Sequence, residues 1–271
     1  MRRTASALLL VGILLLFVGC MRTKQSEEVL ELEGQGIYTL SGGEAVDRWR
    51  GYLVVQGSEV HLPENEVRYC LSDGTQLLTE QDPAGPHLPE DLEEAAQAAI
   101  PAYYQQQGRL YDLQGLLEAA NAEYQSAPES FQPWYVSQDT TLTARSEKAV
   151  WCLTEVMLPL GGAEMTSLQA GAVFDSASGE KLELWSLFRV PEQQAREALL
   201  ADVRQEDPLR AEMLEVMTPE MVTFYPDYAE VFFPLGSLAG EQTPVVVSVS
   251  MEELSAVLRS WAVPQAGESA A

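Results

Sequence analysis

The chain has few of the residues on which most enzyme centres are built. Its 271 residues include two histidines, His61 and His87. His61 borders a predicted strand and His87 lies in a proline-rich stretch, so neither has a partner at metal-ligand spacing. No serine stands in a Gly-x-Ser-x-Gly pattern with a histidine to activate it. The sequence therefore argues against a histidine-based metal centre and against serine or cysteine hydrolases, and it predicts no cofactor and no catalytic residue.

Basic residues are also scarce. Lysine and arginine together number 16, against 41 aspartates and glutamates, which gives a net charge of −25. Such a charge repels nucleic acid, anionic lipid head groups and anionic wall polymers, and it attracts cationic partners. A nucleic-acid-binding role is excluded on this ground. A second interpretation stays open, in which the charge only keeps the surface solvated.

Cysteine is the third scarce residue, with three in the chain. Cys70 and Cys152 each lie in an apolar run that reads as a strand. Outside a membrane the two could be oxidised to a disulfide. Because a buried free cysteine behaves as a small hydrophobic residue, we predict two separate, reduced core thiols.

The third cysteine, Cys20, follows an export signal. Arg2 and Arg3 precede an apolar run over residues 7–18. This run is shorter than the roughly 20 residues that span a bilayer, which favours a secretory signal. Phe17-Val18-Gly19-Cys20 resembles a bacterial lipobox, which implies that Cys20 carries a diacylglyceryl group after cleavage. We expect a signal peptide over 1–19, a lipidated tether over 20–35, and a location at the outer face of the bacterial cytoplasmic membrane.

Periodicity predicts an α+β fold, an antiparallel sheet with helices packed on one face, preceded by a small strand-rich segment. The hydrophobic content of 46% suffices for a core. Alternation and turn signals predict the strand-rich segment over 36–80 and the α+β ectodomain over 88–262, with a disordered tail over 263–271. A stretch with three prolines, 81–89, separates the two parts.

Within the α+β part the pattern predicts individual elements. Helical spacing covers 92–103 and 110–124, and strands at 134–144, 150–158 and 168–175 form an antiparallel meander. A short strand follows at 181–185, then helices that begin at Pro191 and Pro208. A hairpin over 221–233, a strand over 243–249 and a helix over 251–261, with Ser250 and Glu253 as a capping box, complete the order.

Three phrases in this order resemble a known family. The first is Leu160-Gly161-Gly162-Ala163 between two strands, and the second is Phe174-Asp175 followed by a Ser178-Gly179 turn and Leu187-Phe188. The third joins Phe224-Tyr225, Val231-Phe232-Phe233-Pro234 and the stretch 247–254. Together they resemble the extracytoplasmic domain of unknown function that lysozyme-sensing membrane anti-sigma factors share with some peptidoglycan deacetylases.

The resemblance implies a binding or sensing ectodomain, here tethered by lipid and without the sigma-binding or catalytic parts. The family loop usually continues with His-Pro, whereas this chain has Glu164-Met165. Any role that the family histidine performs is therefore not expected of this chain. The loop of Gly161, Gly162, Ala163 and Glu164 remains the candidate ligand-binding loop.

Three hypotheses about function follow. The favoured one is a lipid-anchored, non-enzymatic module that binds a cationic protein such as a lysozyme. The alternative is a cell-wall glycan hydrolase using a carboxylate pair, for which Glu155 and Glu164 flank the Gly-Gly turn. The third is an inert structural lipoprotein. Turnover on peptidoglycan separates the first two.

Overall fold

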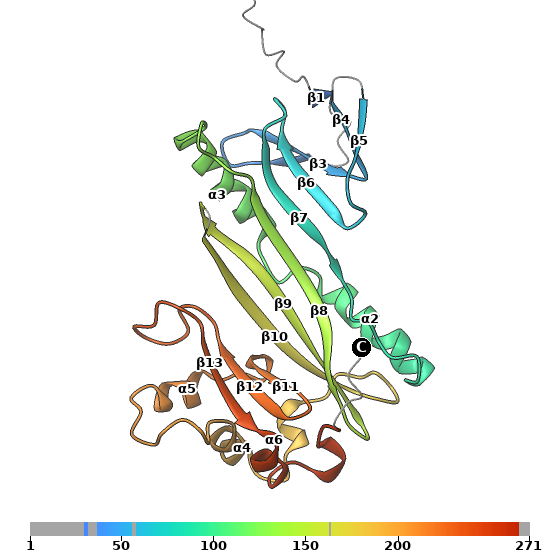
Figure 1. The fold of residues 1–271 in the computed structure, drawn as a ribbon, viewed down its shortest axis with the longest axis vertical. Coiled ribbons are helices and arrows are strands. Elements are labelled where there is room, and N and C mark those ends of the chain that lie inside the picture. The colour runs from blue at the N-terminus through green and yellow to red at the C-terminus, as the bar shows by residue number, and fades with distance from the viewer. Residues whose placement is uncertain (1–29, 32–36, 56–57, 163, 266–271) are drawn as a thin grey trace, which may run out of the picture.

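The computed structural model describes residues 30–31, 37–55, 58–162 and 164–265 (Figure 1). Its centre is a seven-stranded sheet in the order β10-β9-β8-β7-β6-β3-β2. The strands are β2 (Ile37–Thr39), β3 (Ala45–Arg50), β6 (Glu66–Leu71), β7 (Gln76–Ala84), β8 (Trp134–Arg145), β9 (Ala149–Gly161) and β10 (Glu164–Asp175). Two small sheets lie at opposite ends of it, which gives the elongated shape in Figure 1.

The sheet is antiparallel except at one pair. β8, β9 and β10 form the predicted meander, with Thr140 opposite Thr154 and Ala170 opposite Thr154 across the next pair. β7 and β8 run parallel, and the crossover between them holds helices α2 (Glu94–Gln107) and α3 (Leu113–Ser126). A parallel pair needs such a long crossover connection. The predicted α+β class is confirmed.

The crossover helices cover one face of the sheet. Leu117 of α3 packs with Val136 and Val156, and Ile100 of α2 packs with Cys152. These sheet residues have even numbers in β8 and β9, as expected where successive side chains point to opposite faces. The turn after β10 also packs on α2, because a side chain at Gly179 (φ +74°) would collide with Ala96 and Ala99.

The second core lies at the C-terminal end of the sheet. The strands β11 (Val222–Phe224), β12 (Tyr228–Phe233) and β13 (Val245–Ser250) form an antiparallel sheet that packs with α4 (Glu192–Leu199), α5 (Arg210–Val216) and α6 (Met251–Ser255). Trp151 of β9 stacks on Phe224 of β11, with ring centroids 5.5 Å apart. The C-terminal elements are therefore fixed to the main sheet by buried aromatic contact.

The strand-rich N-terminal segment divides between two sheets. β2, β3, β6 and β7 belong to the main sheet, and β1 (Leu30–Glu31), β4 (Tyr52–Val55) and β5 (Ser58–His61) form a sheet of their own. β7 runs past Pro83 into the proline-rich stretch, where its pairing with β8 is irregular. Proline is tolerated at such irregular positions, so the prolines do not end the sheet.

Three element predictions are wrong in detail. The stretch 181–185 makes a single bridge, from Lys181 to Phe174, and then a 3-10 helix, η1 (Leu184–Leu187). Leu184 and Leu187 are both buried, and a spacing of three is the 3-10 period. α5 begins at Arg210 rather than at Pro208.

The last predicted helix is also shorter than expected. α6 ends at Ser255, and after it Leu258 bridges to Phe188. The chain resumes helical turns at η3 (Ser260–Ala262). Its start is as predicted, because the Ser250 hydroxyl accepts the Glu253 N–H at 3.3 Å. Among the described residues, no helix is both long and apolar enough to cross a membrane.

Candidate functional site

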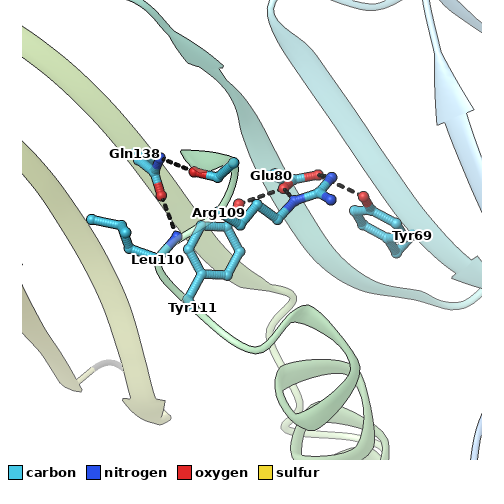
Figure 2. A network of polar contacts seen from close by, with 7 residues as sticks. Tyr69, Glu80, Arg109, Leu110, Tyr111 and Gln138 are labelled. Carbon is cyan, nitrogen blue, oxygen red and sulfur yellow. Dashed lines mark hydrogen bonds and ion pairs between the residues drawn. The ribbon is translucent and has the colours of Figure 1, made fainter. Parts of the chain in front are cut away.

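A buried carboxylate, Glu80 of β7, forms the centre of the most extensive polar network (Figure 2). The Tyr69 hydroxyl donates to Glu80 Oε2 at 2.5 Å, and the Tyr111 hydroxyl donates to Oε1. The Arg109 guanidinium donates to both oxygens, through Nε to Oε1 and through Nη2 to Oε2 at 3.0 Å. Each oxygen of the buried carboxylate thus accepts one hydrogen bond from a tyrosine and one from the cation.

The network keeps Glu80 ionised. Burial would raise the pKa of Glu80, but the hydrogen bonds from Arg109, Tyr111 and Tyr69 outweigh it and hold that pKa below its ordinary value. Burial and the hydrogen bond to Glu80 raise the pKa of Tyr69, so this group remains a donor. A carboxylate saturated by its own chain has little capacity left for a ligand.

A second contact extends the network to β8. Gln138 accepts the Leu110 N–H at 2.8 Å and donates to the Gly108 carbonyl at 2.9 Å (Figure 2). Together with Glu80 it fixes the loop between α2 and α3 against β7 and β8. The network therefore holds the parallel junction of the sheet, and its role is structural.

The two predicted core thiols are buried and free in the structure. Cys70 packs with Trp49 and Leu62, whereas Cys152 packs under α2 in a different cluster. Burial raises the pKa of each thiol to about 12. Because the thiolate is the reactive form, neither is a nucleophile near neutral pH.

The candidate loop lies at the end of the β9–β10 hairpin. Glu123 of α3 accepts the Gly162 N–H at 3.2 Å and the Trp134 indole N–H at 3.0 Å. Gly161 and Gly162 have φ values of +107° and +56°, which glycine adopts without strain. Glu164 is exposed at the start of β10, and Ala163 lies outside the described residues. Cys20 also lies outside them.

The two carboxylates proposed as a catalytic pair are far apart. Glu155 lies in the middle of β9 opposite Gln169, and Glu164 lies opposite Gly161 at the strand's end. Six residues of strand at about 3.3 Å each separate the two positions by roughly 20 Å. Paired glycosidase carboxylates lie within about 9.5 Å of each other. Glu155 and Glu164 therefore cannot act together.

The structure instead gathers exposed and half-buried residues on the sheet face opposite the helices. We call this surface the open face. It consists of odd-numbered residues of β8 and β9 with their partners in β10 and is built from Tyr135, Ser137, Asp139, Glu155, Met157, Met165, Ser167 and Gln169. Figure 1 shows these strands running between the N-terminal strands at one end and β11–β13 at the other.

The register arranges the open face in rows across the strands. Asp139, Glu155 and Gln169 lie side by side, and Gln169 donates to Glu155 at 2.9 Å. The next row holds Met157 between two serines. One step further along the strands lie Tyr135 and Met165, and the Tyr135 hydroxyl donates to Gln81 at 2.7 Å. An acidic row therefore borders an apolar area.

The acidic row, which contains Asp139 and Glu155, lies close to the C-terminal sheet. Burial, and in addition the charge of Glu155, raise the pKa of Glu230 in β12. Burial, then the charges of Glu230 and other neighbours that include Glu155, raise the pKa of Tyr225 to about 12. Tyr225 stacks on Tyr228 with centroids 4.6 Å apart. Glu155 thus has an acidic neighbour, Glu230, that sequence reasoning did not find, because the two lie on different sheets.

His61 and His87 are both exposed and belong to none of these groups. Among the described residues, no group of three histidine, cysteine, aspartate or glutamate side chains is placed to hold a metal ion.

Comparison with known proteins finds similar solved structures only. No family model and no curated protein matches the chain. Among solved structures, it is similar to a DUF3298 family protein of Pseudomonas aeruginosa PAO1, at 15% identity and a TM-score of 0.40, covering 81% of this chain and 96% of that one. It is also similar to a member of the DUF3298 family from Bacteroides fragilis NCTC 9343, at 12% identity and a TM-score of 0.44, covering 87% and 96%.

Proposed function

We propose that this protein is a lipid-anchored extracytoplasmic binding module without enzymatic activity, and that it binds a cationic protein. A lysozyme-like muramidase is the leading candidate, from the family resemblance in the sequence. The observation that carries the proposal is the excess of acidic residues, 41 against 16 basic ones. An electrostatic field of this strength accelerates encounter with a basic partner.

The use of the basic residues inside the fold supports this proposal. Among the described residues, six form the following ion pairs: Arg68–Glu66, Arg109–Glu80, Arg145–Asp91, Lys181–Glu220, Arg196–Glu192 and Arg210–Glu197. Each pair neutralises one cation together with one carboxylate, so these cations do not reduce the surplus of acidic residues. The external field is correspondingly negative.

Binding to a basic protein tests the partner. The mature chain carrying Cys20→Ser is immobilised and titrated with a c-type lysozyme, beside an equally basic protein without muramidase activity. We expect a Kd for lysozyme tighter than about 10 µM. Association should slow steeply as salt rises from about 50 to about 300 mM, because the Debye length shortens. Dissociation should change much less. Absence of binding, or equal binding of both proteins, overturns the proposal.

Lipidation of Cys20 tests the anchor. The full chain and its Cys20→Ser variant are expressed in a host that processes lipoproteins and partitioned into detergent. We expect only the parent chain in the detergent phase, with Cys20 modified by mass spectrometry, because acyl chains supply the membrane affinity. Identical partition of both proteins, or an unmodified Cys20, contradicts the anchor.

The enzymatic alternative has its own test. Glu155 and Glu164 are too far apart to cooperate, whereas Glu155 has Glu230 as a neighbour across the sheet junction. We expect no turnover of purified peptidoglycan or chitooligosaccharides. Sustained turnover that Glu155→Gln or Glu230→Gln abolishes would replace the binding function with a hydrolase.

A further inference from the structure

We infer that the open face of the main sheet is the surface on which the cationic partner docks. Basic side chains of the partner would contact the acidic row of the open face, and an apolar patch of the partner would contact its tyrosine and methionines. This inference rests on the proposed function and names the surface that performs it.

The apolar part of the open face is exposed. Tyr135 is 42% exposed, and Met157 and Met165 are each 40% exposed. Side chains of this size on one face of neighbouring strands form a contiguous patch, which marks an interaction site more often than scattered apolar residues do. Methionine and tyrosine also suit such a surface, because methionine adapts its shape and tyrosine keeps a polar tip.

The acidic part supplies the charge complementarity. Asp139 and Glu155 are exposed neighbours in one row, directly beside Met157. Arg68 of β6 pairs with Thr79 of β7, which in turn pairs with Tyr135, so Arg68 lies on the same face. It is paired with Glu66 at 2.6 Å and adds no net charge to the surface. A partner with lysine or arginine beside an apolar patch therefore matches both parts.

The charges favour this occupant over two others. A second copy of the chain would place one acidic row against another, which opposes self-association through this face. A bilayer with anionic head groups would be repelled by the same carboxylates. A basic protein forms favourable contacts with both the acidic row and the apolar part of the open face.

The open face is also held rigid before binding. β8 and β9 are paired on both sides along this stretch, and the end of the β9–β10 hairpin is fastened to α3 through Glu123. A surface that is already ordered loses little conformational entropy on binding, which increases affinity.

A matched pair of variants tests the inference. Met157→Ser with Glu155→Lys changes the open face. Leu235→Ser with Glu215→Lys makes a comparable apolar-to-polar and charge-reversing change elsewhere, since Leu235 is also 40% exposed and Glu215 is an exposed residue of α5. We expect the first double variant to weaken binding of c-type lysozyme by at least about tenfold, and the second by less than about twofold. Thermal melting of each variant verifies folding.

Footprinting of the unaltered chain gives an independent readout. Hydroxyl radicals should oxidise Tyr135, Met157 and Met165 in the free protein and much less in the presence of saturating lysozyme, while Leu235 and Val246 stay equally reactive. If lysozyme binds but these three residues are unprotected, or both double variants weaken binding equally, the docking surface is wrong and the proposed function stands. If the parent chain binds no lysozyme, both are overturned.

Discussion

Glu80 shows how one residue can fix the junction between two parts of a chain. Its carboxylate is fully buried in β7, and its partners come from β6 and from the loop between α2 and α3. Because a buried charge without its cation is strongly destabilising, the ion pair is required once the carboxylate is there. The network thereby ties the loop position to the sheet.

At this scale we predict the effect of removing the cation. Arg109→Met should lower the free energy of unfolding by about 3 kcal/mol, measured by urea denaturation at pH 7, since it leaves Glu80 charged and buried. The double variant Glu80→Gln with Arg109→Met should recover part of this loss. A loss below about 0.5 kcal/mol in the single variant would contradict a structural role for the pair.

The same network predicts a dependence on pH. The pKa of Glu80 lies below its ordinary value of 4.5 in the folded protein. Its contribution to stability is therefore complete above the unfolded pKa and is lost as pH falls through the folded pKa. The parent chain should lose this contribution on acidification, whereas Glu80→Gln should not. Equal slopes of unfolding free energy against pH below about 4.5 in both proteins would contradict it.

At the scale of single residues, the sequence predicted the buried thiols but did not predict the network around Glu80. Cys70 and Cys152 were identifiable because each sits in a local apolar run. Glu80 and Arg109 are 29 positions apart, and no local pattern connects them. The one signal was a glutamate two residues after the apolar pair Leu77-Leu78, in a stretch that continues as a strand.

At the scale of elements, the contact between β10 and β11 depends on one glycine. A Cβ at Gly171 would lie 2.2 Å from the Val222 carbonyl oxygen. The two backbones therefore meet there without room for a side chain, and this approach seats the C-terminal sheet on the main one.

Gly171→Ala tests that approach. We expect a loss of about 1 to 3 kcal/mol in unfolding free energy, because the new methyl group forces the sheets apart. Gly85→Ala is the matched control, since no atom lies within 4 Å of the added Cβ and φ is not positive. The control should be neutral or slightly stabilising. Equal effects of the two substitutions would show that β10 and β11 are not in close contact.

The elements of the meander could be predicted because alternation sustained over a whole strand is a strong signal. β8, β9 and β10 all lie where period two indicated them. The open face could not be predicted in the same way. Alternation separates the residues of a strand into two faces, but it does not say which face α2 and α3 will cover. The sequence therefore indicated Glu155 as a candidate residue, but it did not predict which residues would surround it.

At the scale of the whole molecule, the net charge of −25 acts on stability as well as on binding. Like charges repel one another more strongly in the compact state, and salt screens this repulsion. We expect the melting temperature to rise by several degrees between about 20 and about 300 mM salt, with sodium and potassium chloride equivalent. Arg109→Met should show the same rise, because its pair is partly buried. A falling melting temperature would mean that exposed ion pairs outweigh the repulsion.

The parallel pairing of β7 with β8 also sets an order of events during synthesis. The N-terminal strands emerge from the ribosome about 50 residues before β8, the neighbour that covers the free edge of β7. Until then the nine residues of Gln76–Ala84 present unpaired backbone groups, which other chains can use as a template. A chain that stalls or is cleaved between α2 and α3 would aggregate through this edge, so the N-terminal strands depend on prompt completion of the crossover to remain monomeric.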